Sequence, residues 1–164
     1  MTTKTYKPTS LESWVSRFYR LNGLLIPEDL QPKEIAERIG IMYIEEPRAS
    51  YSVEQDNFKL INVNENLNDY EKREHFYHEL CHILRHYGNQ MMMPKAFREL
   101  QEWDARHFTL YASIPFHMLH NYKFKDEKIS ENLAIDFNVP HHIAKERVSR
   151  ILRNAIIKKN KTVI

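Results

Sequence analysis

The feature that most constrains this chain is the sequence HELCH at positions 78–82. On a helix, residues four apart lie on the same face, so His78 and His82 can offer two imidazole nitrogens to one metal ion. Glu79 lies beside this pair, within reach of a water molecule that the metal would activate. The pattern therefore predicts a helix that carries a metal-dependent hydrolytic site.

The surrounding stretch, 68–88, has signals for both ends of such a helix. Asn68 and Glu71 have the spacing of a capping box, in which each residue satisfies a backbone N–H near the other. Gly88 is a favourable residue just after a last helical turn. We therefore expect one helix over this whole stretch.

Two further histidines, His75 and His86, extend the same stripe. His82 and His86 are also four apart, but no carboxylate follows His82 directly. Only the pair at 78 and 82 has a glutamate in the position of a general base. The alternative interpretation is a stripe of histidines that is either solvated or satisfied in the core, without a metal.

Composition limits the class of protein. A chain of 164 residues forms one domain, or a small domain with an appendage, and 42% hydrophobic residues are enough for a core. The net charge of +2 does not require a nucleic acid or a membrane surface as partner. A single cysteine, Cys81, excludes an intrachain disulfide and is typical of the reducing cytoplasm. We find no signal peptide and no apolar run long enough to span a bilayer, so we expect a cytoplasmic protein.

The hydrophobic patterning predicts a helix-rich α+β fold with a small three-stranded antiparallel sheet just before the metal helix. The strands are expected at 41–44, 49–54 and 58–63, and the last of them either offers an edge to an extended substrate or lies inside the sheet. Five further helices are expected besides the metal helix. The first begins at a capping box of Thr9 and Glu12 and ends near Gly23, and another runs from a cap at Ser130 to Asp136. The other three are expected over 32–39, 95–112 and 140–158. The apolar side of the helix at 95–112 consists of Phe97, Leu100, Trp103, Phe108 and Tyr111.

A catalytic zinc usually takes three protein ligands and keeps one position open. Glu102 follows His82 by twenty residues, which is enough for the next helix to return antiparallel. Ala105, one turn later, is small enough to let the two helices approach closely. Asp104 and His107 are the alternatives, although we expect Asp104 to point toward the apolar side of its helix. Without the histidine pair, Glu102 would be interpreted as an ordinary solvent-facing acid.

Three blocks of the sequence resemble the ImmA/IrrE family of metallopeptidases. They are HELCH at 78–82 followed by His86, Glu102-x-x-Ala105-x-x-Phe108 followed by Ile114-Pro115, and Leu133-Ala134-x-x-Phe137-Asn138-Val139-Pro140. The similarity spans most of residues 30–152, and the blocks occur in the order that the family has. Thr109 stands where the family usually has alanine, which leaves the ligand positions unchanged.

This resemblance implies a zinc ion held by His78, His82 and Glu102, with Glu79 as the general base of peptide hydrolysis. It also implies a cytoplasmic enzyme, often encoded by phages or mobile elements. Members of the family cleave a helix-turn-helix repressor and so release silenced genes. The cognate repressor is thus the expected protein substrate of this chain.

The resemblance further implies a minimal zincin with a C-terminal helical appendage. We expect residues 1–127 to form the metallopeptidase domain and residues 128–164 to form a helical region that resembles a helix-turn-helix.

Hydrolysis also needs a donor for the developing oxyanion besides the metal. Several side chains are candidates for this role or as partners of the metal ligands, and the sequence does not choose among them: Tyr77, His86, His107, Tyr111, His117 and His120.

Two other functions remain open from the sequence. The C-terminal helices are basic, so the chain could be a DNA-binding or adaptor protein whose metal site is structural. A solvated basic face explains such charge more often, so we do not expect direct nucleic-acid binding. The discriminating observation is whether the basic side chains gather on one exposed face. The other possibility is an inactive scaffold, against which the intact His78, Glu79 and His82 argue.

Overall fold

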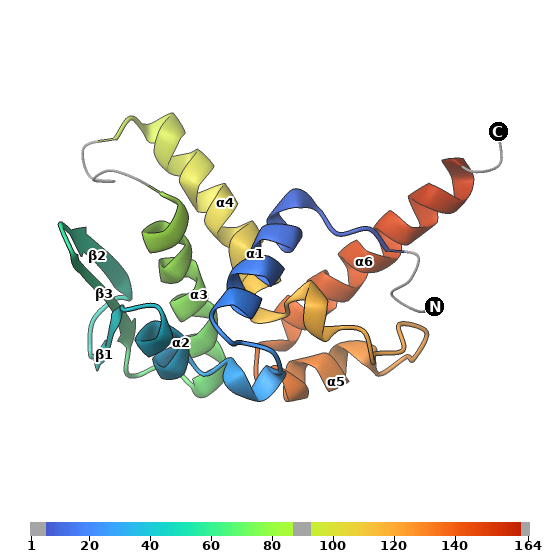
Figure 1. Cartoon of the computed structure of the whole chain (residues 1–164), viewed down its shortest axis with the longest axis horizontal. Coiled ribbons are helices and arrows are strands. Elements are labelled where there is room, and N and C mark those ends of the chain that lie inside the picture. Colours follow the sequence, from blue (N-terminus) through green and yellow to red (C-terminus); the bar gives the residue numbers. More distant parts are fainter. Residues whose placement is uncertain (1–5, 87–92, 162–164) are drawn as a thin grey trace. The chain divides into compact units, whose positions relative to one another are not determined.

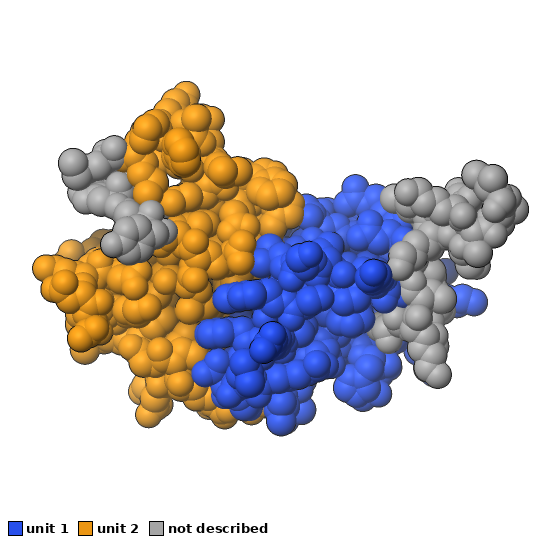
Figure 2. All heavy atoms as spheres, turned by 45° about the horizontal axis from the view of Figure 1, so that its top comes forward, with its two compact units in different colours: residues 1–28, 110–164 blue, residues 29–109 orange. Residues whose placement is uncertain are grey.

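The computed structural model describes residues 6–86 and 93–161 and has an α+β fold, as the sequence predicts (Figure 1). The chain forms two compact units, shown in Figure 2. One consists of residues 29–109, and the other combines residues 1–28 with 110–164. The predicted domain boundary between residues 127 and 128 stays a prediction.

The unit of residues 29–109 contains the three-stranded sheet and the helices around it. Helix α3 packs against β2 and β3, and α2 packs against β1. Gly40, with φ of 72°, turns the chain from α2 toward β1. The elements are α2 (Pro32–Arg38), β1 (Met42–Glu46), β2 (Tyr51–Gln55), β3 (Phe58–Asn64), α3 (Asp69–Arg85) and α4 (Lys95–Ser113), the last of which ends in the other unit.

The sheet is mixed, so the prediction of a purely antiparallel sheet is wrong. Its strand order is β1-β3-β2, with β3 parallel to β1 and antiparallel to β2. The chain reverses direction between β1 and β2 and again between β2 and β3, so β3 runs parallel to β1 when it inserts between the other two strands. Strand β3 therefore lies inside the sheet and offers no edge, whereas β2 is an edge strand of this sheet.

Helix α3 begins as predicted, because both hydrogen bonds of the capping box between Asn68 and Glu71 are present. It ends at Arg85, with His86 as the C-cap residue. The predicted stop at Gly88 lies outside the described residues. The buried face of α3 includes Phe76, Tyr77, Leu80 and Ile83.

Along α4, burial does not follow the predicted apolar side. Phe97, Leu100 and Trp103 are 62%, 61% and 54% exposed. Ala105 and Phe108 are fully buried. The apolar side of this helix is therefore exposed over its first turns and buried only toward its end, at Phe108 and Tyr111.

The other unit is helical. It contains α1 (Ser10–Leu21), the 3₁₀ turn η4 (Phe116–Met118), α5 (Ile129–Asp136) and α6 (His141–Lys161), while the 3₁₀ turn η2 (Pro27–Asp29) spans the boundary between the units. The capping box of Thr9 and Glu12 is confirmed. Ser130 is not a cap, because α5 already begins at Ile129, after Lys128.

Glu12 has a second role that the sequence did not indicate. Its carboxylate pairs with Arg147 at 2.5 Å, and both side chains are inaccessible to solvent. Arg147 therefore belongs to the core of this unit and not to a basic surface.

Among the described residues, no helix has the length and apolar character that crossing a membrane requires.

Candidate metal centre

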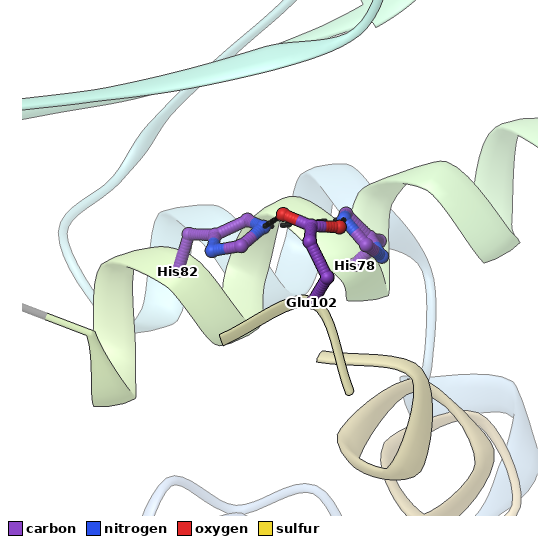
Figure 3. Close-up of side chains that lie close together, drawn as sticks. All are labelled: His78, His82 and Glu102. Atoms are coloured by element: carbon purple, nitrogen blue, oxygen red, sulfur yellow. Dashed lines mark hydrogen bonds and ion pairs between the residues drawn. The ribbon is translucent and has the colours of Figure 1, made fainter. Parts of the chain in front are cut away.

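Three side chains converge on one point in the unit of residues 29–109. His78 and His82 come from α3, and Glu102 comes from α4 (Figure 3). The two Nε2 atoms lie 3.1 Å apart. The Glu102 carboxylate lies across them, with Oε2 at 3.2 Å from His78 Nε2 and Oε1 at 3.4 Å from His82 Nε2. One ligand atom from each residue can therefore contact a single ion.

Local structure explains this convergence. His78 and His82 are four residues apart on α3, so their rings lie on the same helical face, with centroids 4.9 Å apart. Ala105 lies one turn beyond Glu102 and is fully buried, as expected for a position where two helices approach closely.

The chemistry of the three donors suits a divalent metal. Two imidazole nitrogens and one carboxylate form a donor set used by catalytic zinc. Burial, together with the neighbouring His78 and His86, lowers the pKa of His82 to about 4. His82 is therefore neutral near pH 7, which is the form that binds metals. The Glu102 side chain is 39% exposed, so the centre is open on one side.

Glu79 is held from the sheet. The Ser52 hydroxyl on β2 donates a hydrogen bond of 2.8 Å to Glu79 Oε2. Burial raises the pKa of Glu79 above its ordinary value, while the hydrogen bond from Ser52 opposes this change. Sequence reasoning missed Ser52, because nothing in a short strand indicates which residue 27 positions later its side chain will contact.

Asp104, the alternative third ligand, contacts Arg85 and His86 instead of the two histidines of the triad. It accepts hydrogen bonds from Arg85 Nε at 2.8 Å and Arg85 Nη2 at 3.2 Å. Its Oδ2 also lies 3.1 Å from His86 Nε2. The other ring nitrogen of His86, Nδ1, is 2.8 Å from His82 Nδ1. Cys81 completes this second cluster, with Sγ 3.8 Å from Asp104 Oδ2.

The other candidate donors make different contacts. Tyr77 is fully buried, and its hydroxyl donates to the Leu30 carbonyl oxygen at 3.3 Å. His107 Nδ1 lies 2.7 Å from the Trp103 carbonyl oxygen on its own helix. His75, the first histidine of the stripe, contacts the Ser50 hydroxyl at 3.0 Å and not the triad.

Three candidates belong to the other unit. The Tyr111 hydroxyl accepts a hydrogen bond of 3.4 Å from Arg150. His117 Nε2 lies 3.1 Å from the Leu24 carbonyl oxygen, and His120 Nδ1 lies 3.2 Å from the His117 carbonyl oxygen.

Comparison with known proteins decides the family. Residues 35–149 match the family model Peptidase_M78, described as IrrE N-terminal-like domain. The chain belongs to this family. The family is one of metallopeptidases, and the predicted resemblance is thereby confirmed.

Two Bacillus subtilis relatives of this peptidase M78 chain also match. The uncharacterized protein YqaB is 30% identical over 146 residues, which cover 88% of this chain and 85% of YqaB. The phage-like element PBSX protein XkdA is 37% identical over 109 residues, which cover 66% of this chain and 55% of XkdA.

The fold also matches a solved structure, a Mycobacterium tuberculosis transcriptional regulator. The TM-score is 0.59 at 15% sequence identity, over 84% of this chain and 46% of the regulator. At this identity the match shows a shared fold.

Proposed function

We propose that this chain is a zinc-dependent endopeptidase that hydrolyses a specific peptide bond in a protein substrate. The observation that carries this proposal is that one possible ligand atom from each of His78, His82 and Glu102 lies within 4.8 Å of the other two. Glu79, the residue after the first histidine, supplies the general base. Membership of a metallopeptidase family supports the same chemistry.

In the proposed mechanism, His78, His82 and Glu102 would hold a zinc ion, which would supply the Lewis acidity that makes a water molecule more acidic. Glu79 accepts a proton from the attacking water on its carboxylate and then delivers it to the leaving amine. Ser52 holds Oε2 of Glu79 in place, so the carboxylate does not need to reorient for each transfer. The raised pKa of Glu79 favours this exchange, because a more basic carboxylate is a better proton acceptor.

The edge strand β2 is the best candidate for binding an extended substrate. Its Ser52 contacts the proposed base, so a peptide added along β2 would lie beside Glu79. Of the two possibilities that the sequence leaves open for the third strand, an edge or an interior position, the interior one is confirmed, because β3 pairs on both sides.

We further propose that the substrate is the cognate helix-turn-helix repressor and that the chain acts in the cytoplasm. The resemblance to the ImmA/IrrE family motivates this proposal. The relative XkdA is named as a protein of a phage-like element, which agrees with such a regulatory context. The buried free thiol of Cys81 is typical of a reducing compartment.

Co-expression with the repressor encoded beside this chain tests the proposal. We expect cleavage at one or a few bonds by the wild-type chain and by Glu99→Gln, a control at an exposed position of α4. Glu79→Gln should keep its metal and lose cleavage by several orders of magnitude, because the amide cannot accept the proton. Cleavage by Glu79→Gln at the wild-type rate would refute the assignment of the base. Rapid degradation of casein at many bonds would refute the dedicated substrate.

The alternative, a DNA-binding or adaptor protein, has less support. Arg147 is buried against Glu12, and Arg150 and Arg153 both contact Glu146. The described arginines of α6 therefore do not form a free basic face. A salt-sensitive, sequence-selective gel shift with nanomolar affinity would favour this alternative.

A further inference from the structure

A chain of hydrogen-bonding groups leads away from the metal centre through His82. The Nε2 atom of His82 faces His78 and Glu102, while its Nδ1 atom lies on the other side of the ring (Figure 3). That Nδ1 atom is 2.8 Å from His86 Nδ1. The opposite nitrogen of His86, Nε2, is 3.1 Å from Asp104 Oδ2.

Asp104 is itself fixed at the far end of this chain. Arg85 Nε contacts Oδ2 at 2.8 Å, and Arg85 Nη2 contacts Oδ1 at 3.2 Å, so the guanidinium holds both carboxylate oxygens. Because arginine is always charged, Asp104 has a permanent cationic partner. Asp104 is therefore an acceptor only.

The positions of the protons follow from this acceptor. A neutral imidazole carries one N–H and one lone pair. His86 must use its N–H at Nε2 to donate to Asp104, which leaves a lone pair at Nδ1. His82 must then donate from its own Nδ1, which leaves its Nε2 with the lone pair that faces the triad.

We propose that His86 and Asp104 are positioning residues of the metal centre, which hold His82 in the tautomer that can bind a metal through Nε2. This inference rests on the proposed metal site and deepens it. Partners of metal-bound histidines commonly act in this way, by fixing the ring and its tautomer. Here the carboxylate acts through an intermediate histidine, His86, which is the C-cap residue of α3 and lies four residues after His82.

The proton positions of His82 and His86 are incompatible with a metal ion bound at the second cluster. Cys81, His86 and Asp104 also place one ligand atom each within 4.8 Å of the others, as in a second metal site. A metal at His86 Nε2 would require the His86 proton on Nδ1, and His82 would then accept there. The proton of His82 would move to Nε2 and block the first site. Arg85 also already occupies both oxygens of Asp104.

The test uses the full chain with ¹⁵N-labelled histidine. Long-range ¹H–¹⁵N spectra of the zinc-free protein report which nitrogen of His82 carries the proton. We expect the Nδ1–H form in the wild type and a loss of this preference in His86→Phe. His86→Gln should restore it, because the amide oxygen can accept from His82 while the amide N–H₂ donates to Asp104. Retention of the Nδ1–H form in His86→Phe would overturn the proposal.

Zinc affinity supplies an independent readout. Asp104→Asn should bind zinc about 10- to 100-fold more weakly than the wild type, the usual cost of losing such a partner. Glu99→Gln, which removes an exposed acid of the same helix, should bind as the wild type does. Wild-type affinity in both Asp104→Asn and His86→Phe would overturn the proposal.

Two further outcomes separate this inference from its alternatives. Cys81→Ala should still bind one zinc per chain, whereas loss of a second, separate equivalent in this variant would establish the competing metal site. If the wild type binds no zinc at all, the proposed function fails. The tautomer of His82 in the zinc-free chain still decides whether His86 and Asp104 orient that ring.

Discussion

The buried pair of Glu12 and Arg147 gives a quantitative test of the helical unit. The Glu12 carboxylate lies 2.5 Å from Arg147 Nη1 and also accepts from the Tyr6 hydroxyl at 2.7 Å and from the Thr9 backbone N–H at 2.7 Å. Glu12→Leu removes all these acceptors and leaves the guanidinium buried without its counter-charge. Breaking one partner of a buried ion pair typically costs about 3–5 kcal/mol. For a chain of this size, the melting temperature should fall by roughly 6–20 °C.

Urea and thermal unfolding, followed by circular dichroism, measure this effect. Glu146→Gln, which alters an exposed ion pair on the same helix α6, should change stability by no more than about 0.5 kcal/mol. The double variant Glu12→Leu with Arg147→Met should recover most of the loss, because an apolar pair of similar volume removes both buried charges. A loss below about 1 kcal/mol in Glu12→Leu, well under the cost of an unpaired buried charge, would refute the burial of this pair.

Two other predictions concern the unit of residues 29–109. Ser52→Ala should lower kcat/KM for repressor cleavage about 10-fold, because one hydrogen bond to a charged group is lost, while Ser52→Thr keeps the hydroxyl and should stay near the wild type. Unchanged zinc content in both variants would exclude loss of the metal as the cause. Full activity in Ser52→Ala would contradict the role of Ser52. The hydrogen bond from Lys72 lowers the pKa of Glu45 from its ordinary value. This pair therefore stabilises the fold at neutral pH, and its contribution disappears as the pH falls through the lowered pKa. Glu45→Gln should therefore reduce stability by at most about 1 kcal/mol at pH 7 and by less at pH 3 in urea unfolding, and an equal loss at both pH values would contradict this assignment.

The features that the sequence predicts well depend on local chemistry. The capping boxes at Thr9 and Asn68 are present, because each requires only residues within one helical turn. The pair His78 and His82 shares a face for the same reason: helical spacing alone places the two rings together.

The features that the sequence misses depend on contacts between distant segments. The order of the strands follows from pairing across the sheet, which the alternation of residues within β1 or β3 does not encode. Ser52 meets Glu79 only once β2 has packed beside α3. Arg147 has the same charge as the other arginines of α6, and its burial depends on Glu12, which is far away in sequence.

X-ray absorption at the zinc edge of the purified chain tests the central claim most directly. We predict about one zinc per chain, with two imidazole nitrogens at about 2.0–2.1 Å and oxygen ligands at about 2.0–2.2 Å, from Glu102 and a water molecule. Glu102→Ala should lose metal or one oxygen ligand, while Glu99→Gln should reproduce the wild-type spectrum. A sulfur ligand at about 2.3 Å would place the metal at Cys81 and would contradict the assignment of His78, His82 and Glu102.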